Sequence, residues 1–442
     1  MAAATMTTTL QVAVGLCCAA VAWMPEAAAE PTLSFDGFGT VGVVHSNEDR
    51  ADFVSNVFAP DGAGHTRDLS PEVDSRLGLQ LGSEFTPRLS GIVQVVVEQR
   101  YDDTYKPTLE WANIRFDATP RLTLRAGRMV LPIFLASEYR KVSFANPWVR
   151  PPPEVYQTVP ATNFDGIAAS YRRRLGSYDN HLQLVYGGKD TSTPGGGEIE
   201  TRNGFTIANT IERGAGTLFA SYSRTHITAD GFAPLFDAFR SFGPEGEAIA
   251  NRYDADDTPL NILSAGARYD PGDWFAMGEF ALRESRTFIA DFRGWYVTGG
   301  YRLGAVTPYL TLARVWVASN TSDPGLSNPE AQGFNAALND LLGSAARQKS
   351  IALGARWDFA PSMALKLQLD YLDLDSDSSG VLANPQPGFR RGGSATLVSL
   401  ALDFVFWDGE PIEISRSRRF RASAERRDDG ERRGCRRGGL QR

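Results

Sequence analysis

The chain has 442 residues, with 45 basic and 52 acidic side chains, a formal net charge of -7 and 43 glycines. After residue 23 no apolar run approaches the ~20 residues that a membrane-spanning helix requires, which excludes a polytopic helical membrane protein. The acidic balance offers no basic surface for nucleic acid, so no nucleic-acid partner is expected.

Residues 1–29 have the pattern of a secretory signal peptide. An apolar stretch from Leu10 to Trp23 is followed by small residues up to Ala29, and this stretch is too short for a membrane anchor. Cleavage after Ala29 removes two of the three cysteines, so that Cys435 alone remains. A disulfide framework is therefore excluded, and the protein must be stabilised by hydrogen bonding or by a large core.

The mature chain alternates apolar and polar residues with a period of two, as in Met363, Leu365 and Leu367 with Ala364 and Lys366 between them. Both a soluble sandwich and a membrane barrel have strands of this kind. We predict sixteen strands, with fourteen or eighteen as the alternatives. The predicted strands begin near Leu33, Arg76, Gly91, Leu109, Leu122, Asn163, Asn180, Asn203, Thr217, Asn261, Trp274, Gly294, Pro308, Ser350, Met363 and Thr396.

Short and long links alternate between these strands. The short links are 85–89, 118–121, 173–179, 212–216, 270–273, 303–307 and 360–362; the long links are 45–74, 100–108, 128–162, 188–202, 228–260, 284–293, 318–349 and 374–395. Tight turns at one end and long loops at the other are typical of outer-membrane barrels. We therefore predict an all-β protein, a transmembrane antiparallel up-and-down barrel over residues 30–406, with periplasmic turns and extracellular loops.

Large aromatic residues near the strand ends agree with a barrel, because such residues form girdles at the membrane interfaces. We place on the outward, apolar phase Trp274, Trp295, Tyr301, Tyr309, Trp357, Phe359, Tyr371, Phe404 and Phe406.

The last predicted strand carries an apolar residue at every second position and ends on a phenylalanine: Val398, Leu400, Leu402, Phe404 and Phe406. It resembles the C-terminal strand by which Gram-negative outer-membrane proteins are recognised for assembly. With the alternating links, the chain resembles the Gram-negative porin family, which has sixteen-stranded barrels, from about Leu33 to Phe406. The resemblance implies an outer-membrane location, lipid and the barrel-assembly machinery as partners, and a homotrimer.

A long link containing the segment 147–153 follows the fifth predicted strand. In porins the loop at this place folds into the lumen and narrows it, so the resemblance implies a constriction within 128–162. An external loop or a subunit contact is the alternative. The charged residues expected at the constriction are Arg128, Glu138, Arg140, Lys141, Arg150 and Glu154.

The polar phase of the strands predicts further lumenal cations, namely Arg115, Arg125, Arg268, Arg302, Arg356 and Lys366. Residues 30–406 carry 34 basic and 44 acidic side chains, but many acids lie in predicted external loops, where salt screens them beyond roughly 8 Å. We expect weak anion selectivity, carried by Arg128, Arg140, Lys141 and Arg150 at the constriction and by the five arginines at the periplasmic mouth. The alternative is a nearly neutral pore, in which these arginines pair with Asp270, Glu279, Asp358 and Asp370.

The predicted function is passive diffusion of small polar or ionic solutes, without catalysis or a cofactor. The four histidines show no metal-ligand spacing, and His181 and His226 are expected at opposite ends of the wall. The acid-rich segments 254–257 and 373–377 lack the spacing of a calcium loop and are expected to be solvated. An outer-membrane barrel enzyme or a secreted all-β binding protein is the alternative.

Residues 407–442 follow the predicted last strand and depart from the porin pattern. They contain eleven arginines and seven acidic residues without apolar periodicity, which predicts a disordered, Arg-rich tail. A periplasmic arm for an anionic partner and an altered reading frame are the two interpretations.

Overall fold

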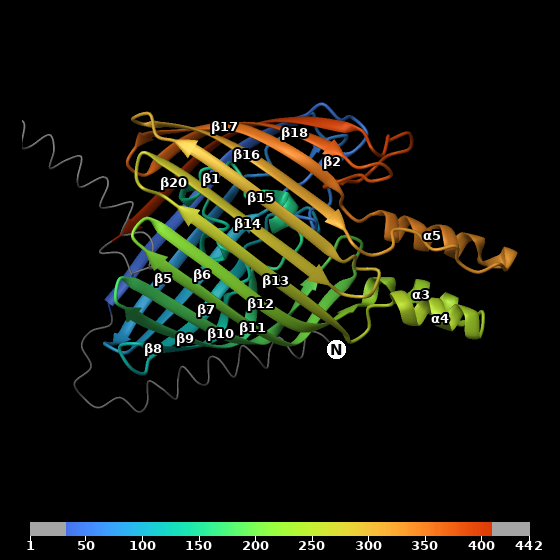
Figure 1. Cartoon of the computed structure of the whole chain (residues 1–442), viewed down its shortest axis with the longest axis horizontal. Coiled ribbons are helices and arrows are strands. Elements are labelled where there is room, and N and C mark those ends of the chain that lie inside the picture. Colours follow the sequence, from blue (N-terminus) through green and yellow to red (C-terminus); the bar gives the residue numbers. More distant parts are fainter. Residues whose placement is uncertain (1–31, 409–442) are drawn as a thin grey trace, which may run out of the picture.

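The computed structural model describes residues 32–408, so that the predicted signal peptide, and the predicted tail beyond residue 408, lie outside the described residues. Sixteen antiparallel strands form a closed barrel (Figure 1). Each strand pairs with its neighbours in sequence, and β1 also pairs with β20, which closes the ring. The prediction of an all-β up-and-down barrel is confirmed, with sixteen strands.

The barrel strands are β1 (Thr32–Ser46), β5 (Arg76–Thr86), β6 (Leu89–Glu98), β7 (Thr108–Asp117), β8 (Leu122–Val130), β9 (Asn163–Leu175), β10 (Tyr178–Ser192), β11 (Glu198–Arg213), β12 (Gly216–Ala229), β13 (Thr258–Tyr269), β14 (Trp274–Glu284), β15 (Phe292–Tyr301), β16 (Val306–Val317), β17 (Gln348–Ala360), β18 (Met363–Leu374) and β20 (Ser394–Asp408). All sixteen predicted strands therefore exist. The last continues through Trp407 and Asp408, two residues beyond its predicted end.

Alternation along each strand separates an apolar outer face from a polar inner face. On β18, Leu367 and Leu369 are 54% and 45% exposed, whereas Lys366 and Gln368, which alternate with them, are buried. A pleated strand turns successive side chains to opposite faces, so one strand supplies both surfaces. The outer surface is therefore suited to lipid and the inner surface to polar contacts.

The predicted arrangement of links holds with one correction. Seven tight turns gather at one end of the barrel with the ends of the described chain, and longer loops gather at the other. The predicted long link 188–202 is wrong, because β10 and β11 continue pairing past a bulge after Gly187 as far as Ser192↔Glu198. Only residues 193–197 connect these two strands.

Three helices occupy two of the long loops: α3 (Ala233–Arg240), α4 (Pro244–Tyr253) and α5 (Gln332–Gly343). They project beyond the barrel end (Figure 1), and Phe236 and Phe239 pack with Leu338 in a small core of their own. Within the described chain, none of the helices is long and apolar enough to cross a membrane.

Shorter strands line the loop end. β4 (Leu69–Ser70) adds to β1, while β2 (Asp52–Phe53), β3 (Ala63–Gly64) and β19 (Leu382–Ala383) form a separate three-stranded sheet. This small sheet connects the first long loop to the last one, which lies next to it in the closed barrel.

Aromatic residues mark the outer face near the tight turns. Tyr269 packs on Trp274 and Trp357 on Phe359, with ring centroids 5.4 and 5.5 Å apart. The placement of Tyr309 outside is wrong: it is 3% exposed and its hydroxyl donates to Gln368 across the inner face. It lies on the inward phase because the exposed Leu310 takes the outward one.

Candidate functional site

The segment 131–162 connects β8 to β9 and crosses the barrel interior. It contains two short 3-10 turns, Ser137–Tyr139 and Ser143–Ala145, and the helix α2 (Pro153–Tyr156). The indole Nε1 of Trp148 donates to Thr298 on β15 and to Thr311 on β16, at 3.0 and 3.1 Å. Because β16 stands opposite β8 in the ring, the segment reaches the far wall. We call residues 131–162 the inner loop.

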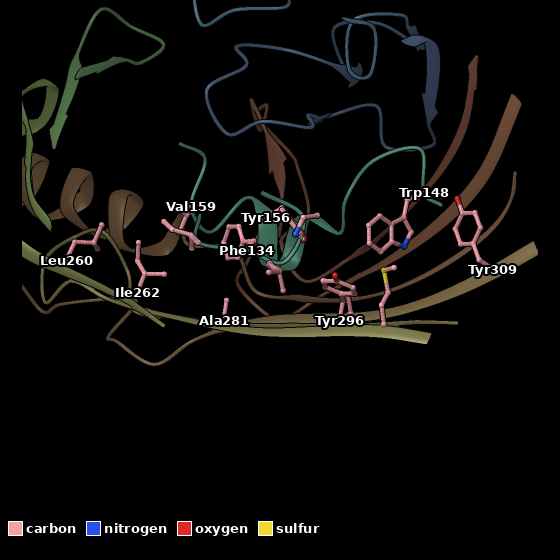
Figure 2. Packing of buried hydrophobic residues seen from close by; sticks show 14 of the residues in the cluster. Phe134, Trp148, Tyr156, Val159, Leu260, Ile262, Ala281, Tyr296 and Tyr309 are labelled. Carbon is pink, nitrogen blue, oxygen red and sulfur yellow. Dashed lines mark hydrogen bonds between the residues drawn. The ribbon is translucent and has the colours of Figure 1, made fainter. Parts of the chain in front are cut away.

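An apolar cluster attaches the inner loop to the inside of β13–β16 (Figure 2). The ring of Tyr156 lies 4.9 Å from that of Phe134 and 6.2 Å from that of Tyr296, and Trp148 packs edge-on against Tyr296 at 5.5 Å. These four rings are 1–3% exposed. Their burial fixes this part of the loop against β13–β16 instead of leaving it free in the lumen.

Glu279 on β14 anchors the start of the inner loop and α2 together. It accepts hydrogen bonds from the Leu135 amide at 2.7 Å, the Tyr156 hydroxyl at 2.9 Å and Ser264 at 3.0 Å. The alternative expectation that Glu279 pairs with an arginine is wrong, because these donors occupy its carboxylate.

Arg150 is the most buried cation of the inner loop, and its side chain is 4% exposed. Its guanidinium binds Asp74 at 2.5 and 2.9 Å and Asp370 at 3.2 Å, donates to Ser399 at 2.7 Å and lies over the ring of Phe53. Burial alone would lower the pKa of Arg150, but Asp74 and Asp370 raise it above its ordinary value. Arg150 therefore stays charged and ties the loop to the wall.

Lys141 is a second, mostly buried cation that binds the inner loop to the wall. Its Nζ lies 2.6 Å from Glu98 on β6 and 2.9 Å from Glu110 on β7, whereas Arg150's wall partners lie on β18 and β20. Burial opposes the charge, yet the two carboxylates hold the pKa of Lys141 above its usual range. Glu110 also accepts from Thr162 at 2.6 Å, so it fixes both the middle and the end of the loop.

Arg140 differs from these two cations because it donates to backbone carbonyls, those of Tyr156 at 2.5 Å and Val159 at 3.0 Å. Burial lowers the pKa of Arg140 to about 10, which leaves it charged at neutral pH. Among the described residues it has no carboxylate within 4.0 Å.

The remaining residues of the predicted constriction are dispersed. Arg128, near the end of β8, makes a two-pronged ion pair with Asp165 at 2.6 and 2.7 Å. Glu154 on α2 is buried and accepts from Gln348 at 2.7 Å, and burial raises its pKa. Glu138 lies within electrostatic range of Arg125. The six residues thus lie around the loop, and three of the four cations are neutralised by carboxylates.

Two of the predicted lumenal cations hold the inner loop from the wall. Lys366 donates to the carbonyls of Ser143 and Trp148 at 2.7 and 2.6 Å and pairs with Asp403 at 2.7 Å. Arg356 donates to the carbonyls of Phe144 and Asn146 at 2.5 and 2.9 Å. A fully buried lysine with a carboxylate and two carbonyls is a structural tie, because no donor is left for a solute.

The other wall cations lie near the tight turns and are mostly paired. Arg268 and Arg302 share Asp270, each at 2.7 Å. Arg115 lies 3.1 Å from Asp117, and Arg356, besides holding the inner loop, pairs with Asp358 at 2.7 Å. Arg125, by contrast, has no ion pair among residues 32–408. The alternative, in which arginines are neutralised, is therefore confirmed for Asp270 and Asp358, and also for Asp370, which pairs with Arg150.

Sequence reasoning missed a cavity of about 830 Å³ between the inner loop and the external loops. We call it the outer cavity. Its lining is predominantly apolar, and two of its cations, Lys189 on β10 and Arg283 on β14, were not singled out from the sequence. Alternation along β10 was the one signal that could have placed Lys189 inside the barrel, because Lys189 is on the same inward phase as the buried Val185 and Gln183.

Three carboxylates in the first two long loops are close enough to share a cation. The ligand atoms of Asp61, Glu72 and Asp103 lie within 4.8 Å of one another. The Gln99 amide donates to all three, at 2.9, 3.5 and 3.2 Å respectively, and Arg67 pairs with Glu72. Arg67 offsets one of the three negative charges, and the neutral Gln99 amide adds hydrogen bonds.

His181 and His226 lie apart, as expected. His181 is near the tight-turn end of β10, and His226 is near the loop end of β12. Asp254 of the acid-rich segment 254–257 pairs with Arg240 at 2.6 Å, so that this residue is not merely solvated.

Comparisons with known proteins agree with this architecture. No protein-family model and no curated protein sequence matches the chain. Among solved structures, the chain is similar to the outer membrane channel DcaP of Acinetobacter baumannii (TM-score 0.51, 12% identity, covering 87% of this chain and 100% of that one). It is also similar to an anion-selective porin from Comamonas acidovorans (0.50, 13%, 85% and 100%) and to OmpF of Salmonella typhi in complex with daunomycin (0.50, 12%, 84% and 97%). The chain therefore has the fold of the Gram-negative outer-membrane porins.

Proposed function

We propose that the protein is an outer-membrane porin that lets small polar or ionic solutes diffuse passively through a water-filled lumen. The observation that carries this proposal is the inner loop, which crosses the inside of a closed sixteen-stranded barrel and is bound to its wall. A barrel of this size is too wide for wall side chains to fill. A loop held across such a lumen narrows it, and so sets a size limit.

The location and partners follow from the same proposal. The apolar outer face fits the lipid of a Gram-negative outer membrane, and a signal peptide over residues 1–29 would direct export. We propose β20, with Val398, Leu400, Leu402, Phe404 and Phe406, as the strand recognised by the barrel-assembly machinery. A homotrimer rests on the resemblance to porins alone.

A channel is favoured over an enzyme because the buried ionisable groups are engaged with one another. Arg150, Lys141, Lys366 and Glu279 each bind loop or wall groups that hold the inner loop in place. A catalytic acid or base must be within hydrogen-bond reach of a substrate, whereas these groups make their hydrogen bonds to the inner loop and the wall. We propose no cofactor.

We further propose a weak anion preference. Since Arg128, Lys141 and Arg150 are ion-paired, Arg125 and Arg140 are the better carriers, with Lys189 and Arg283 in the outer cavity. Charge in a narrow, partly desolvated passage acts on a permeating ion at short range and is weakly screened.

Planar-bilayer recordings of the purified barrel test the channel. Stepwise ohmic conductance is expected, and a heat-modifiable barrel that never conducts would overturn the proposal. Deleting residues 138–147, which removes Lys141 and the carbonyls bound by Arg356, should raise the single-channel conductance severalfold. An unchanged conductance in a folded deletion variant would contradict the role of the inner loop as the constriction.

A further inference from the structure

The outer cavity has walls unlike those expected for a passage of hydrated ions. It is lined by both ends of the inner loop, by the loop ends of β9–β16, and by external loops that include residues 54–58, α5 and residues 379–391. Its apolar lining includes Val54, Ile133, Val159, Phe164, Val185 and Ile262. Such a surface gains free energy by taking up an apolar body, at roughly 25 cal/mol per Å² removed from water.

The charges of the outer cavity are predominantly positive. Its ionisable lining consists of Lys189, Arg283 and Arg391 against a single carboxylate, Asp340. A ligand that satisfies both its walls and its charge must therefore be apolar over most of its surface and anionic at one end.

Two of these cations have hydrogen-bond donors left for a ligand. Lys189 donates to Asn163, and Arg283 donates to the carbonyls of Thr158 and Ala290 at 2.6 and 3.0 Å. Neither has a carboxylate within 4.0 Å in the part of the chain that the structure describes, and the buried Nε of Arg283 has no hydrogen-bond partner there. An ammonium has three donors and a guanidinium five, so both retain donors for a carboxylate.

We propose that the outer cavity binds organic monocarboxylates with an apolar body, such as aryl-alkanoates, before they pass the inner loop. The site deepens the proposed channel function and rests on it for its role in uptake. Its volume of about 830 Å³ is within the range of ~300–1,000 Å³ typical of small-molecule sites. A hydrophilic anion leaves the apolar walls unused, and an apolar cation is repelled by Lys189 and Arg283.

Calorimetric titration of the full barrel in lipid nanodiscs tests the site, with protein-free nanodiscs as the blank. The three probes are 4-phenylbutyrate, gluconate, which has the charge without the apolar body, and 4-phenylbutylammonium, which has the body with the opposite charge. Saturable binding of 4-phenylbutyrate alone is expected. Equal binding of the ammonium probe, or equal binding of gluconate, would overturn the assignment.

Variants locate the site. Lys189→Gln should weaken 4-phenylbutyrate binding by about tenfold, because a charge-assisted hydrogen bond is lost. Val185→Thr, nearly identical in shape, should also weaken it by placing a hydroxyl in the apolar wall. Lys106→Gln, which removes an exposed lysine paired with Asp102 in another loop, is the matched control and should bind as the parent does. Heat-modifiable mobility verifies that each variant is folded.

Conductance measured on the same preparations separates the two proposals. A barrel that conducts but binds no 4-phenylbutyrate overturns the site and leaves the channel standing. A barrel that binds the probe selectively but never conducts supports the site and overturns the channel, and with it the proposed role in uptake.

Discussion

The backbone carbonyl of Glu154 on α2 lies directly against the Cα of Gly294 on β15. A Cβ at residue 294 would overlap this oxygen and the carbonyl carbon behind it. The wall thus lacks a side chain where the inner loop approaches it closely, and the contact depends on glycine for space.

Gly294→Ala should displace α2 from the wall. Overpacking of this kind costs about 1–3 kcal/mol, and the loosened loop should raise the single-channel conductance and its noise. Gly299→Ala on the same strand is the matched control, since a Cβ there meets only the Phe275 carbonyl at 3.9 Å. Identical recordings from the two variants would show that the α2 contact does not set the conductance.

Arg150→Gln should destabilise the barrel more than any exposed ion-pair variant. It leaves Asp74 and Asp370 buried without their cation, which costs about 3–5 kcal/mol. Urea unfolding followed by tryptophan fluorescence measures the loss. Arg174→Gln, which breaks an exposed pair with Asp179, should cost no more than about 1 kcal/mol.

Neutralising the two acids tests the cause of that loss. If uncompensated charge is responsible, adding Asp74→Asn and Asp370→Asn to Arg150→Gln should recover much of the stability. No recovery would mean that the geometry of the guanidinium, rather than the charge balance, stabilises the loop.

Glu154→Gln should stabilise the fold in a pH-dependent manner. Burial raises the pKa of Glu154 in the folded state, so the folded protein favours the protonated form. Its contribution to stability is full below the unfolded pKa and is lost as pH rises through the folded pKa. The variant should therefore unfold at a higher urea midpoint than the parent at pH 8 and at a similar midpoint at pH 4. A difference independent of pH would contradict this assignment.

Arg125→Gln should reduce the anion preference measured as a reversal potential in a KCl gradient. Arg125 has no ion pair in the described chain, so its replacement removes net positive charge from the inner wall. The double variant Arg174→Gln, Asp179→Asn removes a neutral pair and should leave the reversal potential unchanged. Cation preference in the parent protein would refute the expected selectivity itself.

The strands could be predicted from the sequence because lipid and lumen impose a period of two on each one locally. Even the bulged strands β10 and β11 were found, although their pairing beyond the bulge was not predicted. The short helices α3, α4 and α5 were not predicted, because their apolar residues pack on each other across two distant loops. The sequence of one loop does not reveal that the other loop is its packing partner.

The inner loop shows where sequence reasoning stops. Its place could be inferred from the order of links, but the partners of its charges could not. Arg150 meets Asp74 and Asp370, which are 76 and 220 positions away, and Glu279 meets Tyr156 across 123 positions. Alternation assigns a side chain to the inside of a barrel, whereas its neighbour across the lumen depends on the shear and closure of the whole ring.

The seam between β1 and β20 has a consequence for the time course of folding. Twelve residue pairs join the first strand to the last, and the rings of Phe404 and Phe406 cover Gly39 and Gly37. Until β20 arrives, β1 keeps an open edge with bare glycines, and unpaired edges invite aggregation. Contacts between such distant segments also form slowly. A chain interrupted before residue 394 cannot complete the ring, so closure is a single late event that only a chain reaching the last strand can undergo.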